Sequence, residues 1–379
     1  MTEFPFHLMI KPAGPDCNLS CEYCYYLEKS RYYDQDVHRM DDETLERVTA
    51  AYLKNHPGGE VVFAWQGGEP LLMGIEFFRR ALDLQTKYSR PDQQVVNTLQ
   101  TNAMLIDEDW AAFFAENGFL IGVSLDGPAD LHDRYRRDRG GRPSHSRVLK
   151  GLEHLQRHNV EHNALVTVNR VNVEHPLRVY NHLVDLGVRY LQYIPIVECQ
   201  SRDSHEVTVQ TVRPEPFGDF LCKTFDHWVA NDVGRVFVQL FESTLNVWLG
   251  GFPSVCVYAP MCGRALVVEH NGDLYACDHF VYPEYRRGVV NVDDLASLVD
   301  GPEQQSFGEA KAALSLECRR CQVLPFCGGD CPKHRIRRAD GDYTISYLCS
   351  GYRRFFTHSA PVLRDIAAAI AQDLSTRLA

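Results

Sequence analysis

Short apolar runs alternate with amphipathic helical stretches six times between Phe6 and about Val197. Such alternation is typical of βα units around a parallel sheet, because each buried strand is followed by a helix that crosses back over the sheet. The expected strands are Phe6–Lys11, Val61–Trp65, Val95–Gln100, Leu120–Leu125, Asn163–Val168 and Tyr190–Ile194. The expected helices between them are Asp42–Asn55, Ile75–Tyr88, Asp107–Asn117, Ser146–His158 and His175–Leu186. Six units predict an α/β fold, an open and partial (β/α)6 barrel of the TIM type.

The chain changes character after two more helical stretches, Pro216–Val233 and Val238–Leu249, because cysteines then crowd together. Residues Leu266–Phe280 predict a β-hairpin around Asn271-Gly272, a pair that tolerates the positive φ of a tight turn. The hairpin would present Cys277, Asp278 and His279 at the end of its second strand. A last helix, Ala360–Leu378, is expected to serve packing only. We therefore expect two domains, residues 1–235 and 236–379.

Composition narrows the function. A chain of 379 residues with 45% hydrophobic content can fill a substantial core, and its formal charge of −11 repels a nucleic-acid backbone. The apolar runs are too short to span a membrane, and the N-terminus lacks the pattern of a secretion signal, so we expect a cytoplasmic protein that binds neither nucleic acid nor membrane. Thirteen cysteines in such a chain favour metal or redox chemistry over disulfides.

The first cysteine cluster, Cys17-x3-Cys21-x2-Cys24, follows the first strand directly. In a barrel that position lies at the C-terminal face, where active sites gather. Three thiolates on a 4Fe–4S cluster leave one iron open, and the amino and carboxylate groups of a methionine moiety can chelate it. A zinc site with a histidine as fourth ligand is the alternative, but no nearby histidine has the spacing of a zinc finger.

This spacing, followed by Tyr25 and Tyr26, resembles the radical S-adenosylmethionine superfamily. Two further motifs stand at strand ends, Gln66-Gly67-Gly68-Glu69-Pro70 and Ser124-Leu125-Asp126-Gly127-Pro128. In the first, the glycines allow the backbone to approach the methionine end of the cofactor closely, and the glutamate can accept a hydrogen bond from the cofactor ammonium. Without the cysteine cluster beside it, the first motif could be an ordinary turn. The arginines of residues 134–139 could likewise be a basic run that points into solvent. The resemblance implies cofactor contacts from Tyr23, Gln66, Gly67, Gly68, Glu69, Ser124, Arg136 and Val197.

The C-terminal array holds eight cysteines, with the spacing Cys256-x5-Cys262-x14-Cys277 followed by Cys318-x2-Cys321-x5-Cys327-x3-Cys331-x17-Cys349. Four thiolates close a 4Fe–4S cluster, so eight imply two clusters suited to electron transfer. Cys199 and Cys222 remain, and we assign them to packing. A pair of zinc-ribbon sites is the competing interpretation, because Cys318-x2-Cys321 alone favours zinc.

The array resembles the auxiliary-cluster (SPASM) extension of peptide-modifying radical enzymes. Over nearly the whole chain, the sequence is similar to the anaerobic sulfatase-maturating enzymes, which oxidise a cysteine or serine of a sulfatase to formylglycine. The motifs that carry this resemblance include 10–13 (Ile-Lys-Pro-Ala), 63–70 and 99–102. The resemblance implies S-adenosylmethionine and three 4Fe–4S clusters. It divides the eight C-terminal ligands into one set of Cys256, Cys262, Cys277 and Cys331 and another of Cys318, Cys321, Cys327 and Cys349.

The implied reaction needs more than a radical. After a 5′-deoxyadenosyl radical takes hydrogen from the target Cβ, the resulting radical must lose a proton and an electron to become an aldehyde. Asp278, adjacent to Cys277, is the expected base, although it could instead accept a backbone hydrogen bond near a cluster. The auxiliary clusters would accept the electron. The expected partners are an unfolded or nascent sulfatase polypeptide and an electron donor such as flavodoxin or ferredoxin.

Two other functions share parts of this pattern. An enzyme that forms thioether or carbon–carbon crosslinks would use the same cluster ligands but would differ in product and in its need for Asp278. A polyferredoxin-like electron carrier is disfavoured, because a carrier has no use for an open iron beside a Gly-Gly-Glu-Pro loop.

Overall fold

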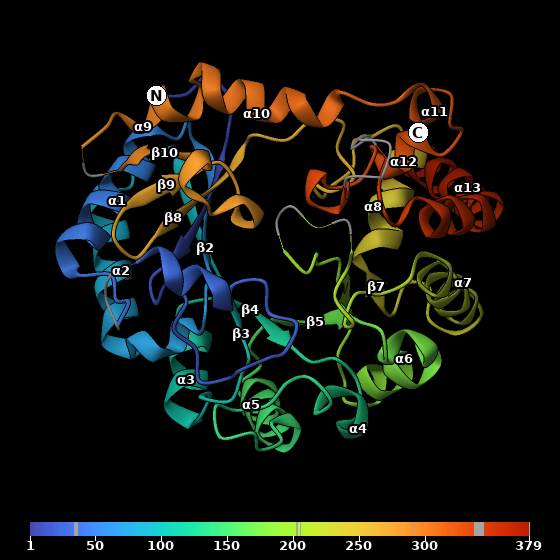
Figure 1. Ribbon diagram of the computed structural model, residues 1–379, viewed down its shortest axis with the longest axis horizontal. Helices are drawn as coiled ribbons and strands as arrows, with labels where there is room; N and C mark the ends of the chain where they lie inside the picture. The colour runs from blue at the N-terminus through green and yellow to red at the C-terminus, as the bar shows by residue number, and fades with distance from the viewer. Residues whose placement is uncertain (34–36, 202–203, 205, 291, 337–344, 379) are drawn as a thin grey trace. The chain divides into compact units, whose positions relative to one another are not determined.

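A computed structural model of the chain describes residues 1–33, 37–201, 204, 206–290, 292–336 and 345–378 (Figure 1). It divides into two compact units. The first comprises Met1–Ser124, Asp133–Asn163 and Cys262–Glu309, and the second comprises Leu125–His132, Ala164–Met261 and Ala310–Ala379. Each unit therefore takes residues from both the N-terminal and the C-terminal parts of the sequence.

The first unit is built on parallel strands. β1 (His7–Lys11), β2 (Gly59–Trp65), β3 (Gln93–Thr101) and β4 (Leu120–Ser124) pair in that order, all in parallel. Side chains such as Leu8, Phe63 and Leu99 are buried, as expected of strands covered on both faces. The carboxyl ends of these strands meet at one edge, so the segments after β1, β2 and β3 become neighbours.

The other edge of β1 pairs with the C-terminal hairpin. β8 (Ala265–Glu269) runs parallel to β1, with Lys11 opposite Glu269, and β9 (Asp273–Tyr275) turns back antiparallel to β8. Gly272 takes φ +86° in the turn, as the predicted hairpin requires. β10 (Arg286–Val289) completes this edge. Figure 1 shows β8 and β9 beside the N-terminal strands although their residues come late in the chain.

Four longer helices of the first unit follow its strands: α1 (Asp42–Asn55), α2 (Ile75–Tyr88), α3 (Glu108–Glu116) and α5 (His145–Arg157). Asp41 and Asp107 cap α1 and α3 by accepting from the backbone amides of Thr44 and Trp110. A fifth longer helix, α10 (Pro302–Ala312), has its last turn in the second unit. The remaining short elements are η1 (Leu27–Tyr32), η2 (Pro70–Met73), η4 (Asp278–Phe280), η5 (Pro283–Tyr285) and α9 (Leu295–Val299).

The second unit contains most of β5 (His162–Val168) with β6 (Tyr190–Pro195) and β7 (Phe237–Val238), again in parallel. Its longer helices are α6 (Pro176–Asp185), α7 (Pro214–Asn231), α8 (Gln239–Trp248) and α13 (Cys349–Leu378). Its short elements are α4 (Ala129–His132), η3 (Asn172–Glu174), α11 (Leu316–Arg319), α12 (Leu324–Cys327) and η6 (Pro332–His334).

The helices α7 and α13 lie side by side (Figure 1) and approach very closely at two glycines. A Cβ added to Gly218 would lie 2.9 Å from the Cα of Gly351. Phe217 then packs edge-on against Tyr352, with ring centroids 5.5 Å apart. α13 begins at Cys349, well before the predicted start at Ala360, because Pro361 reads as a first-turn proline yet lies inside the helix. The helix therefore begins with a cysteine of the C-terminal array, while the packing role was predicted for residues 360–378 alone.

All six predicted parallel strands are present, each with bounds within two residues of the expected ones. The predicted α/β class is confirmed. None of the helices in the described part of the chain is long and apolar enough to cross a membrane.

Candidate active site

The three-cysteine loop begins directly after β1. Burial, with smaller contributions from Glu69, Cys21 and Cys24, raises the pKa of the Cys17 thiol to about 12. The backbone amide of Leu19 donates to the Cys17 Sγ at 3.3 Å. Burial also raises the pKa of Cys24, although the amides of Tyr26 and Leu27 donate to its sulfur and act to lower it.

These features fit a cluster cradle. A coordinating metal deprotonates thiols even where burial disfavours the thiolate, and amide donors aimed at the sulfurs stabilise the charge of a bound cluster. The charges of Cys21 and Cys24 both act to raise the pKa of Cys17, as expected of thiols that belong to one loop. The donor set is therefore the one that a 4Fe–4S cluster with an open iron needs.

The Gly-Gly-Glu-Pro motif braces this loop through its backbone. The amides of Gly68 and Glu69 donate to the carbonyls of Gly14 and Asp16, both at 2.8 Å. A Cβ on Gly68 would lie 2.0 Å from the Asp16 carbonyl oxygen, so no other residue fits there. The glycine predicted to allow approach of the cofactor thus approaches the protein's own cysteine loop. Gln66 donates its amide to Ile10 at 2.9 Å, and Gly67 takes φ +122°.

Glu69 is fully buried, and burial raises its pKa to about 7. One carboxylate oxygen accepts from the Thr101 hydroxyl at 2.8 Å, and the other accepts from the Asn102 amide at 2.9 Å. The Asn102 side chain donates to Asn18 at 2.6 Å and lies 3.7 Å from the Cys17 sulfur. Sequence reasoning missed Thr101 and Asn102 as site residues. Their place at the end of β3, next to the motif after β2, was the available signal.

The other expected cofactor contacts lie at strand ends and in the loop after β4. Arg136 is buried, with its guanidinium carbon 5.5 Å from the centre of the Tyr23 ring. Tyr23 in turn packs edge-on against Tyr135 at 5.8 Å. Ser124 is buried at the last position of β4. Val197 belongs to the second unit, where it is buried just after β6.

Asp278 follows β9 and is held by two residues from the other end of the chain. The Lys11 Nζ forms an ion pair with one carboxylate oxygen, and the Tyr25 hydroxyl donates to the other. Burial acts to raise the pKa of Asp278, but the Lys11 ammonium, with smaller contributions from His279 and Tyr25, holds it at about 2. The carboxylate is therefore ionised, and 16% of its side chain is exposed.

Lys11 is itself held by a second contact, which is with an aromatic ring. Its side chain is 1% exposed, and its Nζ lies 3.5 Å from the centre of the Tyr26 ring. The Tyr26 hydroxyl donates a hydrogen bond to the Glu269 carboxylate. Glu269 lies opposite Lys11 in the register between β1 and β8. Sequence reasoning singled out neither Lys11 nor Tyr25 as a contact of Asp278. A lysine that ends an otherwise apolar strand was the available signal for the first.

In the second unit, one small, largely apolar cavity is lined by four cysteine side chains together with Tyr352 and Val323. The four are Cys318, Cys321, Cys327 and Cys349. Burial raises the pKa of Cys327 to about 12, with further contributions from Asp330, Cys321 and Cys318. The Gly329 amide lies 3.5 Å from its sulfur. The structure thus brings together the set that the family resemblance implied, although Cys349 is distant in sequence from the other three.

The other four C-terminal cysteines are divided between the units. Cys262 and Cys277 belong to the first unit, and Cys256 and Cys331 belong to the second. Cys277 directly precedes η4, and Cys331 directly precedes η6. The two cysteines assigned to packing differ in burial: Cys222 is buried in α7, and Cys199 is half-buried after β6.

Two family models match the chain. The Radical SAM superfamily model matches residues 12–183, and an iron–sulfur cluster-binding domain (SPASM) model matches residues 256–322. Together with the parallel fold and the two thiol sites, these matches define a radical S-adenosylmethionine protein with a C-terminal iron–sulfur domain, as predicted. S-adenosylmethionine and 4Fe–4S clusters are accordingly its cofactors.

Similar proteins narrow this class. The chain is 42% identical to the serine-type anaerobic sulfatase-maturating enzyme of Bacteroides thetaiotaomicron, over 95% of this chain and 90% of that one. It is 33% identical to the cysteine-type enzyme of Clostridium perfringens, over 96% and 98% of the two chains. The solved structure of native anSMEcpe with bound AdoMet and Cp18Cys peptide matches with a TM-score of 0.88 at 32% identity, covering 97% of this chain and 99% of that one. The chain belongs to the anaerobic sulfatase-maturating enzymes.

Proposed function

We propose that this protein oxidises a cysteine or serine in a sulfatase polypeptide to Cα-formylglycine without oxygen. The observation that carries this proposal is the partly buried cluster of Lys11, Asp278 and Tyr25. Lys11 ends the strand that leads into the three-cysteine loop, and Tyr25 follows Cys24 directly, so an ionised carboxylate is tied to both ends of the segment that holds the cluster ligands. A crosslinking enzyme or an electron carrier gives no comparable reason for this carboxylate.

Each thiol group has a proposed part. Cys17, Cys21 and Cys24 hold a 4Fe–4S cluster with an open iron, which together with bound S-adenosylmethionine supplies a 5′-deoxyadenosyl radical. Glu69 accepts from the amino group of the cofactor's methionine moiety, and Gly68 fixes the loop beneath it. Tyr23, Gln66, Gly67, Ser124, Arg136 and Val197 are the further proposed cofactor contacts.

Two C-terminal clusters bring the proposed total to three. One takes Cys318, Cys321, Cys327 and Cys349, whose shared cavity supports this assignment. The other takes Cys256, Cys262, Cys277 and Cys331. Both are closed by four thiolates, so their proposed role is to accept an electron from the substrate rather than to bind a cofactor.

The oxidation balances as follows. The target Cβ loses one hydrogen atom to the adenosyl radical, and the radical that remains loses one electron to the C-terminal clusters. The proton that Asp278 accepts comes from the hydroxyl of a serine or the thiol of a cysteine, so the Cβ keeps the one hydrogen of the aldehyde. A serine becomes the aldehyde directly. A cysteine becomes a thioaldehyde, and water then releases hydrogen sulfide to leave the same aldehyde. Lys11 and Tyr25 keep Asp278 ionised and fixed, so the base is ready before the hydrogen atom is removed.

The partial burial of Asp278 bears on the form of the substrate. Only a small part of its side chain meets solvent, so a target residue inside a folded sulfatase domain has no way to reach it. The proposed partner is therefore an unfolded or nascent sulfatase polypeptide. A flavodoxin or ferredoxin is the proposed electron donor, and the cytoplasm is the proposed compartment. We also propose that residues 1–235 and 236–379 act as the radical and the auxiliary-cluster domains.

Paired peptides test this function. The anaerobically reconstituted protein is incubated with a reductant, S-adenosylmethionine and two sulfatase-motif peptides that differ only in a cysteine or serine at the target position. We expect the serine peptide to lose two hydrogens, or the cysteine peptide to lose two hydrogens and exchange its sulfur for oxygen, or both. Deoxyadenosine formation with either a crosslinked peptide or no change in peptide mass would contradict the proposal.

A further inference from the structure

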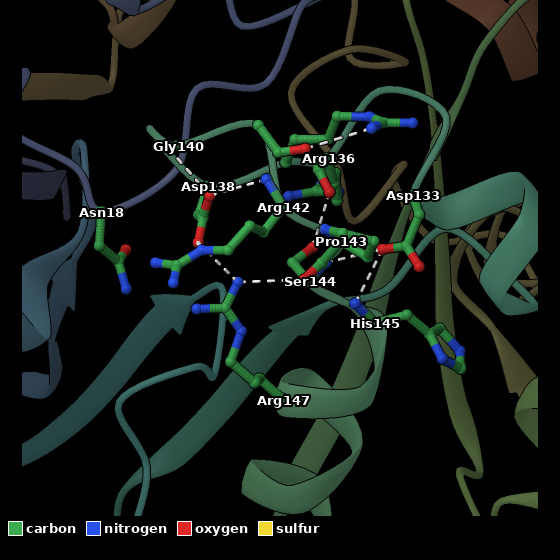
Figure 2. Close-up of polar contacts among 12 residues, drawn as sticks. Asn18, Asp133, Arg136, Asp138, Gly140, Arg142, Pro143, Ser144, His145 and Arg147 are labelled. Carbon is green, nitrogen blue, oxygen red and sulfur yellow. Dashed lines mark hydrogen bonds and ion pairs between the residues drawn. The ribbon is translucent and has the colours of Figure 1, made fainter.

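The segment that joins α4 to α5, together with the first residues of α5, carries an unusual density of positive charge. Between residues 133 and 147 there are six arginines and only two acidic residues, Asp133 and Asp138. Such a run ordinarily points into solvent, since like charges repel one another. Here the loop is folded back on itself, and Figure 2 shows that both acidic side chains face inward and collect hydrogen bonds.

Asp138 is the centre of this fold. One carboxylate oxygen accepts from the backbone amides of Gly140 at 3.0 Å and Arg142 at 2.9 Å. The other accepts from the Arg142 Nε at 2.9 Å and from the Arg147 guanidinium at 3.0 Å. Four donors fill the capacity of the carboxylate. These bonds, with that from the Arg142 amide the strongest, lower its pKa to about 2, so the group is ionised in any working buffer.

The far end of the loop is tied to the start of α5. Asp133 accepts from the amides of Ser144 and His145 at 2.8 and 2.9 Å, and the Ser144 hydroxyl donates to the Arg136 carbonyl at 2.7 Å (Figure 2). An antiparallel bridge joins Arg137 to Pro143. The backbone around Arg136 is thus held from one side by its own loop.

From the other side the same backbone holds the three-cysteine loop. The amide of Ser20 donates to the Arg137 carbonyl at 2.8 Å, and that of Glu22 donates to the Tyr135 carbonyl at 3.1 Å. An antiparallel bridge joins Leu19 to Asp138 itself. The residues that separate Cys17, Cys21 and Cys24 are therefore paired with residues 135–138, and Arg136 between them places its guanidinium over Tyr23.

We propose that Asp138 is a positioning residue for the cofactor site. By neutralising Arg142 and Arg147 and closing their hairpin, it holds the strand that pairs with the three-cysteine loop and directs Arg136 toward Tyr23. Asp138 does not touch the cofactor in this proposal and acts through Arg136 and the loop. The inference rests on the proposed cofactor site, and it assigns a role to a residue that the reaction itself does not require.

The variant Asp138→Asn separates the hydrogen bonds that Asp138 accepts from backbone amides from those that it accepts from arginine side chains. An asparagine oxygen can still accept from the amides of Gly140 and Arg142, but its NH2 group cannot accept from the two guanidiniums. Losing hydrogen bonds to charged donors while leaving two arginines face to face should displace the loop. We expect the reconstituted variant to keep its iron, to bind S-adenosylmethionine about ten-fold more weakly or worse, and to exchange the amides of Ser20 and Glu22 about ten-fold faster.

Two companion variants make the test decisive. Asp92→Asn is the matched control, because the Asp92 carboxylate also pairs with an arginine, Arg90, at an exposed turn of the same unit, and neither readout should change. Arg147→Gln removes one guanidinium but leaves the Asp138 carboxylate, so an intermediate effect is expected. If Asp138→Asn fails to retain iron, the affinity of the Arg147→Gln variant for S-adenosylmethionine and its amide exchange at Ser20 and Glu22 test the proposed role of Asp138 instead.

An unchanged dissociation constant for S-adenosylmethionine in an iron-replete Asp138→Asn protein would overturn the inference. So would weaker binding with unchanged exchange at Ser20 and Glu22, because the effect would then not pass through the loop. The proposed function fails separately: a wild-type protein that binds S-adenosylmethionine but makes no formylglycine would contradict that function and leave the role of Asp138 standing.

Discussion

Lys11 and Asp278 lie 267 positions apart in the sequence, yet their side chains form a buried ion pair. The pairing of β1 with β8 underlies this contact, because it sets Lys11 opposite Glu269 and brings the hairpin that leads into Asp278 alongside β1. A buried lysine without a partner is costly, so each member of the pair constrains the other. The geometry favours a carboxylate that is fixed and ionised before substrate arrives.

Replacing Lys11 by methionine should uncouple the reaction in part. Asp278 would remain but would lose its fixed position, and displacement of a catalytic group by about 1 Å can cost about 10²-fold in rate. We expect cluster content and reductive cleavage of S-adenosylmethionine to persist while formylglycine yield falls by about ten-fold or more. Both products can be quantified in one incubation.

Lys29→Met is the matched control for that variant. Lys29 is equally buried in the same unit, but its ammonium lies 3.2 Å from the centre of the Tyr282 ring and near Glu28 rather than at Asp278. Uncoupling in the Lys29 variant to the same extent would show that loss of any buried charge, rather than loss of the Asp278 contact, explains the result.

The iron content should divide according to the three thiol sets. Reconstituted protein should hold about twelve irons per chain, and Ala at Cys17, Cys21 and Cys24 should leave about eight while abolishing cofactor cleavage. Replacing Cys199 and Cys222 by Ala should leave all of the irons in place. Zinc in place of iron, or cofactor cleavage that survives loss of the first three cysteines, would refute this division.

Cofactor affinity should depend on pH through Glu69. Burial raises the pKa of this carboxyl to about 7, so it is largely neutral below that pH and ionised above it. Only the ionised form attracts the cationic amino group, and binding of the cofactor must therefore displace a proton at low pH. We expect the dissociation constant for S-adenosylmethionine to rise as pH falls from 8 to 6, by less than about ten-fold per pH unit.

Glu69→Gln is the control for this dependence. It keeps one oxygen, which can accept from either the Thr101 hydroxyl or the Asn102 amide, and it has no charge to titrate. Binding should be weaker at pH 8 and flat over the same range. A slope in the variant equal to that of the wild type would assign the pH dependence to another group.

Local patterns predicted the strands, most helices and the Asn271-Gly272 turn, because apolar periodicity and turn chemistry are written in neighbouring residues. They did not predict that the hairpin pairs with β1, since the register between distant strands depends on tertiary packing. The contacts of Lys11 and Tyr25 with Asp278 follow from that register and were missed with it. The contact of Gly68 with the backbone before Cys17 was also not predicted. A glycine in a sequence indicates that another group comes close to the backbone, but it does not identify that group.

The central claim is that Asp278 takes the proton released during formylglycine formation. Asp278→Asn preserves size and shape but removes basicity, so the account predicts intact clusters, normal cleavage of S-adenosylmethionine, and formylglycine reduced by about 10²-fold or more. The decisive measurement is the ratio of deoxyadenosine to formylglycine in single incubations of variant and wild type. A ratio that rises steeply in the variant is the predicted result, whereas a ratio equal to that of the wild type, with all clusters present, would contradict the account.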